Sequence, residues 1–418
     1  MKRIRLVVAV ALVLFIPYMA IAAGQSATTS GPVEIQMVLP TGDFEGDEMN
    51  VNSFMEAFPD IKVSFIAMPG EIEQYMSLKA AADEVPDVFG INPNSFGADL
   101  ADRGIVGDIG HTKVWKNLLP GSKLMFTSPG GKRFGIPPGV ATMLYYYRLD
   151  TFEKYNLEVP TNWEEFLDVC ETLKENGEVP IISQHAGALL HFGTTFGQNV
   201  VPKFPKYIEM VRGGTFDFDI PEVADAFGRS KILFEAGYFQ EGYVGTEYTV
   251  ALSMYLQGKG VMHFNGNWLS GDVFGEDAPF ESGAFVPPYN HEGEEMTPVV
   301  GSETGYGVKE QTGSKREASE SLLEWWFGDG YEFYQNRNGK TPAFIEPVGN
   351  MKLAQAILDA LATIGEAEKS GNMGFEFMPS EAYGLIGTLL DEVILGIKTP
   401  AEAARALGKA AKEAVADE

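Results

Sequence analysis

The chain has 418 residues, of which 45% are hydrophobic, and a formal net charge of −27. This length favours two or three domains with large cores. Binding of nucleic acid needs clustered lysine and arginine, so the acidic balance argues against a nucleic-acid partner.

The N-terminus has the pattern of a secretory signal. A short basic segment is followed by the apolar segment Leu6–Ile16 and by the small-residue pattern Ala20-Ile21-Ala22. We therefore expect residues 1–22 to be a cleaved signal peptide and residues 23–30 a linker. A membrane anchor is the alternative, because the apolar stretch extends to Ala23 and approaches the roughly 20 residues of a spanning helix. Pro17 and the cleavage pattern favour removal.

Cys170 is the single cysteine. The chain therefore has no internal disulfide and no paired cysteines for a metal or redox centre. No cysteine follows the cleavage pattern to carry a lipid, which favours a protein released into a periplasm over a tethered one. Cys170 lies on the apolar face of a predicted helix, so we expect it in the core.

Strands and helices alternate after the linker. The predicted strands are 33–39, 61–66 and 86–91, and the predicted helices are 49–58 and 72–82. This order is typical of a parallel, doubly wound sheet. Ligands of such sheets bind at the carboxyl ends of the strands, which here means Thr41–Phe44 and Asn92–Ser95.

A second α/β unit begins after a turn at Gly130-Gly131 and a helix-breaking segment, Pro137-Pro138-Gly139. A strand is predicted over 143–147 and a short helix over 151–155, ended by Asn156. Thr161 and Glu164 have the spacing of a capping box. The helix that follows has an apolar face made of Trp163, Phe166, Leu167, Cys170 and Leu173.

Several motifs along the chain carry a resemblance to a known family. They include GGKRFGIPPG and the segment after it, FMEAFPDIKVSF, PDVF, LADRGIVGDIG, LQGKGVMHFNGNW and GKTPAF. Their order and spacing resemble the sugar-type extracellular solute-binding proteins of ABC importers, the family that includes maltose-binding protein. The resemblance covers nearly the whole mature chain.

The resemblance implies a periplasmic-binding-protein-like α/β fold of type II, with two doubly wound lobes around a ligand cleft and about three chain crossings. We would assign residues 31–142 and 302–344 to one lobe, and 143–301 and 345–418 to the other. The implied function is capture of a carbohydrate by lobe closure, followed by docking onto a membrane permease. A monomer without cofactor, metal or catalytic residues is expected.

Sugar rings stack on aromatic side chains, and their hydroxyls bind carboxylates, amides and guanidinium groups. The aromatic candidates are Phe44, Tyr145, Trp268 and Trp325. Of the adjacent Trp325 and Trp326, one is expected in the core, and for the run Tyr145–Tyr147 packing is the competing interpretation. The polar candidates follow strands or lie at crossings: Asp43, Asn92, Asn94, Gln184, His185, Glu303, Thr304 and Arg337. For each of these, an exposed loop residue is the alternative.

One position departs from the family pattern. Arg148 stands before Asp150 where many members have asparagine. It would suit a ligand with an acidic group, such as a uronic acid, or form a salt bridge with Asp150 or Glu153.

Other functions remain as alternatives. The motifs HExxH, GxSxG and GxxxxGK[ST] are absent from the sequence. The 58 acidic residues nevertheless supply many chance carboxylate pairs, so a secreted glycoside-active enzyme is one alternative. A binding protein for a polyamine or peptide also fits. A surface adhesin would predict repeats, and the sequence has none.

Overall fold

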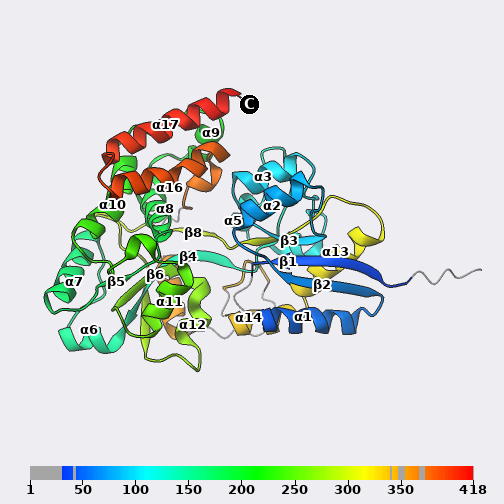
Figure 1. The fold of residues 1–418 in the computed structure, drawn as a ribbon, viewed down its shortest axis with the longest axis horizontal. Helices are drawn as coiled ribbons and strands as arrows, with labels where there is room; N and C mark the ends of the chain where they lie inside the picture. Colours follow the sequence, from blue (N-terminus) through cyan, green and yellow to red (C-terminus); the bar gives the residue numbers. More distant parts are fainter. Residues whose placement is uncertain (1–30, 41–43, 339–340, 347–353, 367–371, 418) are drawn as a thin grey trace, which may run out of the picture.

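The computed structural model describes residues 31–40, 44–338, 341–346, 354–366 and 372–417. The described chain forms two lobes, each built on its own β-sheet (Figure 1). The predicted signal peptide, the linker and Asp43 lie outside the described residues.

The first lobe is built on a four-stranded sheet of order β2-β1-β3-β9. Its strands are β1 (Val33–Leu39), β2 (Ile61–Ala67), β3 (Val88–Ile91) and β9 (Gly305–Val308). The first three are parallel, as their order along the chain predicts, and β9 is antiparallel to β3. β1 lies inside the sheet, which explains why its last three residues are all buried.

Helices flank this sheet (Figure 1). They are α1 (Phe44–Ala57), α2 (Ile72–Ala81), α3 (Ser95–Asp102), α4 (Lys113–Asn117), α5 (Pro120–Met125), α13 (Ser314–Trp326) and α14 (Tyr331–Asn338). Helix α1 begins five residues earlier than the predicted Met49, so Phe44 is its first residue instead of part of a loop. Trp326 is buried in the core of this lobe.

The second lobe has a mixed sheet of order β5-β6-β4-β7. Its strands are β4 (Val140–Arg148), β5 (Ile181–Ile182), β6 (Met262–Gly266), β7 (Ser282–Phe285) and β8 (Val300–Ser302), which pairs with the start of β4. β4 is antiparallel to β6, β7 and β8, and only β5 and β6 are parallel. The regular parallel winding expected for both lobes therefore describes the first sheet better than the second, because β4 enters from the other lobe and runs against its neighbours.

The second lobe carries most of the helices. They are α6 (Leu149–Tyr155), α7 (Trp163–Glu175), α8 (Gly187–Asn199), η1 (Val201–Lys203), α9 (Tyr207–Arg212), α10 (Pro221–Glu235), η2 (Tyr243–Gly245), α11 (Tyr248–Leu256), η3 (Asn267–Leu269), α12 (Ser270–Phe274), α15 (Gln355–Glu366), η4 (Phe375–Phe377), α16 (Ser380–Ile394) and α17 (Pro400–Asp417). Within the described residues, no helix combines the length and the apolar character needed to cross a bilayer.

Two local predictions in this lobe can be compared with the structure. Asn156 ends α6 in the left-handed conformation, with φ of 52°, as predicted. The capping box of α7 is shifted by one residue from the prediction. Asn162, not Thr161, is the N-cap and accepts from the Glu165 amide, while the Glu165 carboxylate accepts from Thr161. The amide side chain satisfies the same unpaired N–H group that a threonine would.

Segments far apart in the sequence lie side by side between the lobes. β4 and β8 run together across the middle of the molecule (Figure 1), with Val140 paired to Ser302. The Val140 amide also donates to the Thr341 carbonyl at 2.9 Å. The chain therefore passes from one sheet to the other along three neighbouring segments.

Candidate ligand site

The first lobe contributes a polar cluster at the carboxyl end of β3. Asn94 is the N-cap of α3, and its side chain accepts from the Gly97 amide at 3.0 Å. The Nδ2 groups of Asn92 and Asn94 donate to the same oxygen of Glu73, at 2.9 and 2.8 Å. The Thr304 hydroxyl donates to Asn92 Oδ1 at 2.7 Å. Three predicted residues are therefore brought together, around a carboxylate that we did not predict.

The second lobe meets this cluster through the segment around η4. The Ser95 hydroxyl donates to the carbonyls of Glu376, at 3.2 Å, and of Met378. Helix α16 also contacts α3, and the Asn94 side chain acts to lower the pKa of Tyr383, against the larger effect of burial. The end of β3 is therefore in direct contact with the start of α16.

Two carboxyl groups shape the electrostatics of this contact. Burial raises the pKa of Glu376 to about 7, although backbone N–H groups of its own turn stabilise the charged form. Burial, followed by the charges of Glu73 and Glu376, raises the pKa of Tyr383 to about 12. Among the described residues no cation pairs with Glu73 or Glu376, and the Oε2 atom of Glu376 is buried without a hydrogen-bond partner. A neutral or cationic ligand suits this environment better than an anionic one.

The ends of β6 and η3 supply an aromatic pair. The Trp268 ring lies against Gly266, where a Cβ atom would be only 2.1 Å from the ring. Its indole Nε1 donates to the Tyr248 hydroxyl at 3.2 Å, and both side chains are partly exposed. The pair is therefore held in place while part of its surface remains open to contact a ligand.

Gln184 and His185 follow β5, as predicted. Gln184 is 3% exposed, and its Oε1 has no hydrogen-bond partner. The imidazole Nε2 of His185 lies 2.6 Å from Asp391 Oδ1 on α16. The His185 amide donates to the Thr246 carbonyl, which brings this loop close to the start of α11 and hence to Tyr248.

Glu303 lies in the crossing that contains β8. Its side chain is buried, and its amide donates to the Gly139 carbonyl at 3.1 Å. A Cβ atom on Gly139 would come within 3.0 Å of the Glu303 carboxylate and 2.7 Å of the Thr341 carbonyl oxygen. A larger residue at position 139 would therefore separate two of the crossing segments.

Several predicted residues are not part of this arrangement. Tyr145 is a correction: it is 0% exposed, and its hydroxyl bonds to Tyr289 within the core. Trp325 packs edge-on against Phe54, between α1 and α13, so it is also a packing residue. Phe44 stacks on Phe65 at the edge strand β2. Arg337 is in α14, but its side chain lies outside what the structure describes, as does the whole of Asp43.

Arg148 lies at the far end of β4 from the crossing. Its guanidinium pairs with Asp150 at 2.7 Å and covers the Phe280 ring at 5.1 Å. Of the two explanations offered for this residue, the salt bridge is confirmed, so Arg148 gives no support to an acidic ligand.

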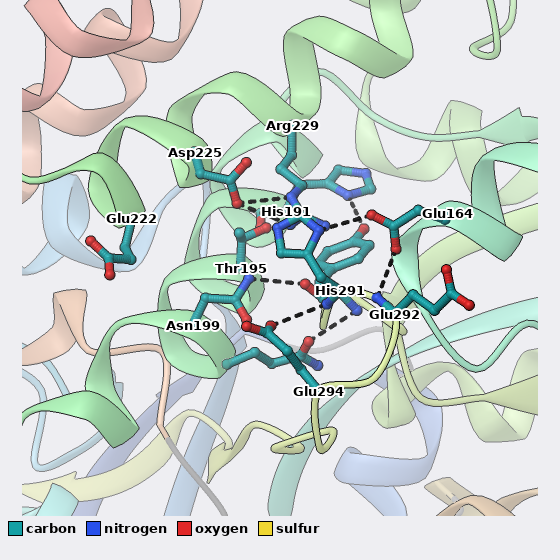
Figure 2. Close-up of polar contacts among 12 residues, drawn as sticks. Glu164, His191, Thr195, Asn199, Glu222, Asp225, Arg229, His291, Glu292 and Glu294 are labelled. Carbon is teal, nitrogen blue, oxygen red and sulfur yellow. Dashed lines mark hydrogen bonds and ion pairs between the residues drawn. The ribbon is translucent and has the colours of Figure 1, made fainter.

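A separate polar cluster joins α7, α10 and the loop after β7 (Figure 2). Arg229, 1% exposed, pairs with Asp225 and lies 3.2 Å from His291 Nε2. His291 Nδ1 is 2.9 Å from Glu164, whose pKa is lowered by this hydrogen bond. Because a guanidinium group can only donate, Arg229 donates to His291 Nε2, and His291 Nδ1 faces the Glu164 carboxylate.

His191 and His263, unlike His291, are fully buried core residues. Burial lowers the pKa of His191 to about 3 and that of His263 to about 4. Nowhere in the described chain do three His, Cys, Asp or Glu side chains gather in a way that could hold a metal ion.

Comparison with known proteins places this chain in a family. The profile of the family described as bacterial extracellular solute-binding protein matches residues 40–332. The chain belongs to this family. Two relatives are an uncharacterized ABC transporter extracellular-binding protein of Pyrococcus horikoshii and the multiple sugar-binding protein of Streptococcus mutans. The first is 24% identical over 288 residues, 63% of this chain and 66% of the relative. The second is 23% identical over 278 residues, 64% of each chain.

The chain thus spans slightly under two thirds of the length of these relatives. A solved structure of a chitin oligosaccharide binding protein superimposes with a TM-score of 0.79 and 19% identity, covering 92% of this chain and 99% of that one. This likeness confirms the predicted two-lobed α/β fold of the solute-binding protein.

Proposed function

We propose that this solute-binding protein captures a mono- or oligosaccharide between its lobes and delivers it to the permease of an ABC importer. The observation that carries the proposal is the Trp268–Tyr248 pair, a partly exposed aromatic surface held in position by Gly266 and by one hydrogen bond. Such a surface suits the C–H face of a sugar ring. The names of a relative, the multiple sugar-binding protein, and of a structural neighbour, the chitin oligosaccharide binding protein, support it.

The polar groups complement this surface in the proposed cleft. Glu73, Asn92 and Asn94 on the first lobe, with Gln184 and His185 on the second, supply acceptors and donors for sugar hydroxyls. Glu303 and Thr304 extend the set to the crossing. Lobe closure would bring the two sets onto one ligand and exclude water, as in other hinge-closing proteins.

We further propose the lobe division stated from the sequence, 31–142 with 302–344 and 143–301 with 345–418. The hydrophobic cores support it, since Met143, Phe285 and Phe375 belong to the second core and Tyr306, Trp326 and Phe344 to the first. Export through the signal peptide, release into a periplasm and a monomeric state belong to the same proposal.

A thermal-shift screen of residues 23–418 against sugars tests the function. Neutral mono- and oligosaccharides form one set, and polyamines, peptides and uronic acids form the controls. A ligand at a hundredfold excess over Kd adds about 2.7 kcal/mol of stability, so a true ligand stands out. A thermal shift with polyamines or peptides, and none with neutral sugars, would show that the carbohydrate assignment is wrong. Hydrolysis of an oligosaccharide by the protein would contradict a purely binding role.

A further inference from the structure

Asn267 lies between two parts of the molecule. One is the proposed sugar-stacking surface of Trp268 and Tyr248, called the aromatic platform below, and the other is the hinge formed by the three crossing segments. Asn267 is 1% exposed and directly precedes Trp268 in the short helix η3. Its Oδ1 accepts from the Thr142 amide at 3.1 Å, and its Nδ2 donates to the Val140 carbonyl at 3.0 Å. Nδ2 also donates to the Thr341 hydroxyl at 3.2 Å. A single side chain is therefore bonded to two of the three segments that cross between the lobes.

The third crossing segment is joined to the same point. Val140, which accepts from Asn267, is paired with Ser302 of β8 and donates to the Thr341 carbonyl at 2.9 Å. Rotation of one lobe against the other changes backbone angles in these segments. The Asn267 amide consequently holds two crossings, and through Val140 the third, in one relative position.

Asn267 is also connected directly to Trp268 of the aromatic platform. It shares a turn of 3-10 helix with Trp268, and the Ser270 hydroxyl donates to its carbonyl at 2.5 Å. The Trp268 ring covers Gly266 on the other side of Asn267. The backbone of Trp268 is therefore joined to that of Asn267 by one peptide bond, and its ring packs against the residue on the other side of Asn267.

We propose that Asn267 is a positioning residue that couples ligand contact at Trp268 to the angle between the lobes. The proposal rests on the proposed function, because it needs a ligand on Trp268. Asn267 itself does not touch the ligand. It makes the orientation of the platform depend on the orientation of the crossings, so that closure and stacking stabilise each other.

Asn265, in the strand β6 that leads into η3, provides a matched control. It is 0% exposed, yet among the described residues its side chain bonds only to the Gly266 amide and to His263, within β6 itself. Asn265→Ala thus removes a buried amide of the same kind without touching a crossing. Thr341→Val is a second variant, which removes only the hydroxyl that accepts from Asn267.

The experiment measures the distance between the lobes by single-molecule fluorescence transfer in the mature protein. Cys170 is fully buried, so dyes can be attached at two new surface cysteines, Glu56→Cys on α1 and Lys409→Cys on α17. Distance distributions are recorded without ligand and across a titration with the sugar that gives the largest thermal shift. Melting curves confirm that each variant is folded.

We expect Asn267→Ala to broaden the ligand-free distribution and to weaken ligand-induced closure, with about a tenfold rise in the ligand concentration at half-closure. Thr341→Val should do the same to a smaller extent, and Asn265→Ala should leave both readouts at wild-type values. A wild-type distribution and titration for Asn267→Ala, or equal effects of Asn265→Ala, would overturn the proposal. If Asn267→Ala does not fold, Thr341→Val decides between these outcomes.

The two proposals fail in different ways. If no sugar closes the wild-type protein, the substrate assignment is wrong, whereas the ligand-free distributions still decide whether Asn267 holds the hinge. If sugar closes the wild type and Asn267→Ala equally, with equal ligand-free distributions, the function stands and the coupling is refuted.

Discussion

The Ser95 hydroxyl of the first lobe donates a hydrogen bond to the Glu376 carbonyl of the second, at 3.2 Å. The residues beside Glu376 belong to different cores: Phe375 packs in the second lobe and Phe377 in the first. Glu376 therefore lies where the lobes meet. A Cβ on Gly301, in the crossing strand β8, would be 4.0 Å from its carboxylate. Burial at this meeting point explains why its pKa is raised.

Glu376 should make stability fall as pH rises towards neutrality. Its pKa in the folded protein is about 7, above the ordinary value of 4.5, so the folded state binds the proton more tightly than the unfolded state. The stabilisation is complete below the unfolded pKa and is lost as pH rises through the folded one. The expected loss is about 2 to 3 kcal/mol, measured by urea unfolding between pH 5 and pH 8.

Glu376→Gln removes this titration and should flatten the profile relative to wild type. The buried His191 and His263 have lowered pKa values and act in the opposite direction, but they are present in both proteins and cancel in the difference. Glu381→Gln, an exposed carboxylate on α16, is the control and should follow wild type. Parallel profiles for wild type and Glu376→Gln would refute the assignment.

Trp268→Ala should remove most of the ligand response, because the stacking surface is lost. Loss of an aromatic contact costs about 1 to 3 kcal/mol, or roughly a tenfold to hundredfold rise in Kd. Trp325→Ala is the comparison. It opens the packing against Phe54 and should lower the free energy of unfolding by about 3 kcal/mol, with Kd unchanged. Isothermal titration measures Kd, and urea unfolding measures the free energy of unfolding. An unchanged Kd in Trp268→Ala would show that the ligand does not stack on Trp268.

Gly266→Ala should impair binding without removing any ligand contact. The added methyl would lie about 2.1 Å from the Trp268 ring, so the ring has to move. We expect a rise in Kd of about tenfold, approaching that of Trp268→Ala. Gly384→Ala is a suitable control, because a Cβ there meets nothing within 4 Å. If Gly266→Ala has the same Kd as wild type, ligand binding does not depend on the position of the Trp268 ring.

The sequence predicted those parts of the site that depend on neighbours in the chain. Hydrophobic patterns in the sequence placed β1 to β3 and α2, and the resemblance to sugar-binding proteins made Trp268 a candidate at the end of a strand. Glu73 and Glu376 were not predicted, because their contacts are with residues distant in the sequence. Glu73 accepts from Asn94, 21 positions away, and the Glu376 carbonyl accepts from Ser95, 281 positions away. No local pattern distinguishes these carboxylates from the many on the surface.

Tyr145 was wrongly predicted for a different reason. Alternation along β4 implied that one face of the strand could reach the cleft, but Tyr145 and Tyr146 are both 0% exposed although they point to opposite faces. Their positions in two separate core clusters show that both faces of this strand are covered. Whether a strand is covered on one face or two depends on helices contributed from elsewhere in the chain, such as α8 and α11.

Arg148→Gln should leave ligand binding unchanged. Its guanidinium is held by Asp150, the Gly258 carbonyl and the Phe280 ring, all at the end of β4 away from the crossing. The loss of these contacts is expected to lower stability by about 1 kcal/mol. A sugar panel that includes uronic acids, read by thermal shift, tests the point. Selective loss of uronic-acid binding in Arg148→Gln would restore the acidic-ligand hypothesis.

Arg229→Ala should destabilise the second lobe strongly while sparing the ligand site. The guanidinium is buried 4.3 Å from the Trp163 ring and joins Asp225 of α10 to His291 (Figure 2). Truncation leaves a cavity and removes the N–H group that donates to His291. We therefore expect the free energy of unfolding, measured with urea, to fall by about 3 kcal/mol. Lys231→Ala, on the same helix, removes a partly exposed pair with Glu235 at 3.6 Å and should cost less than about 1 kcal/mol. Equal losses for the two variants would mean that Arg229 contributes no more than a surface ion pair.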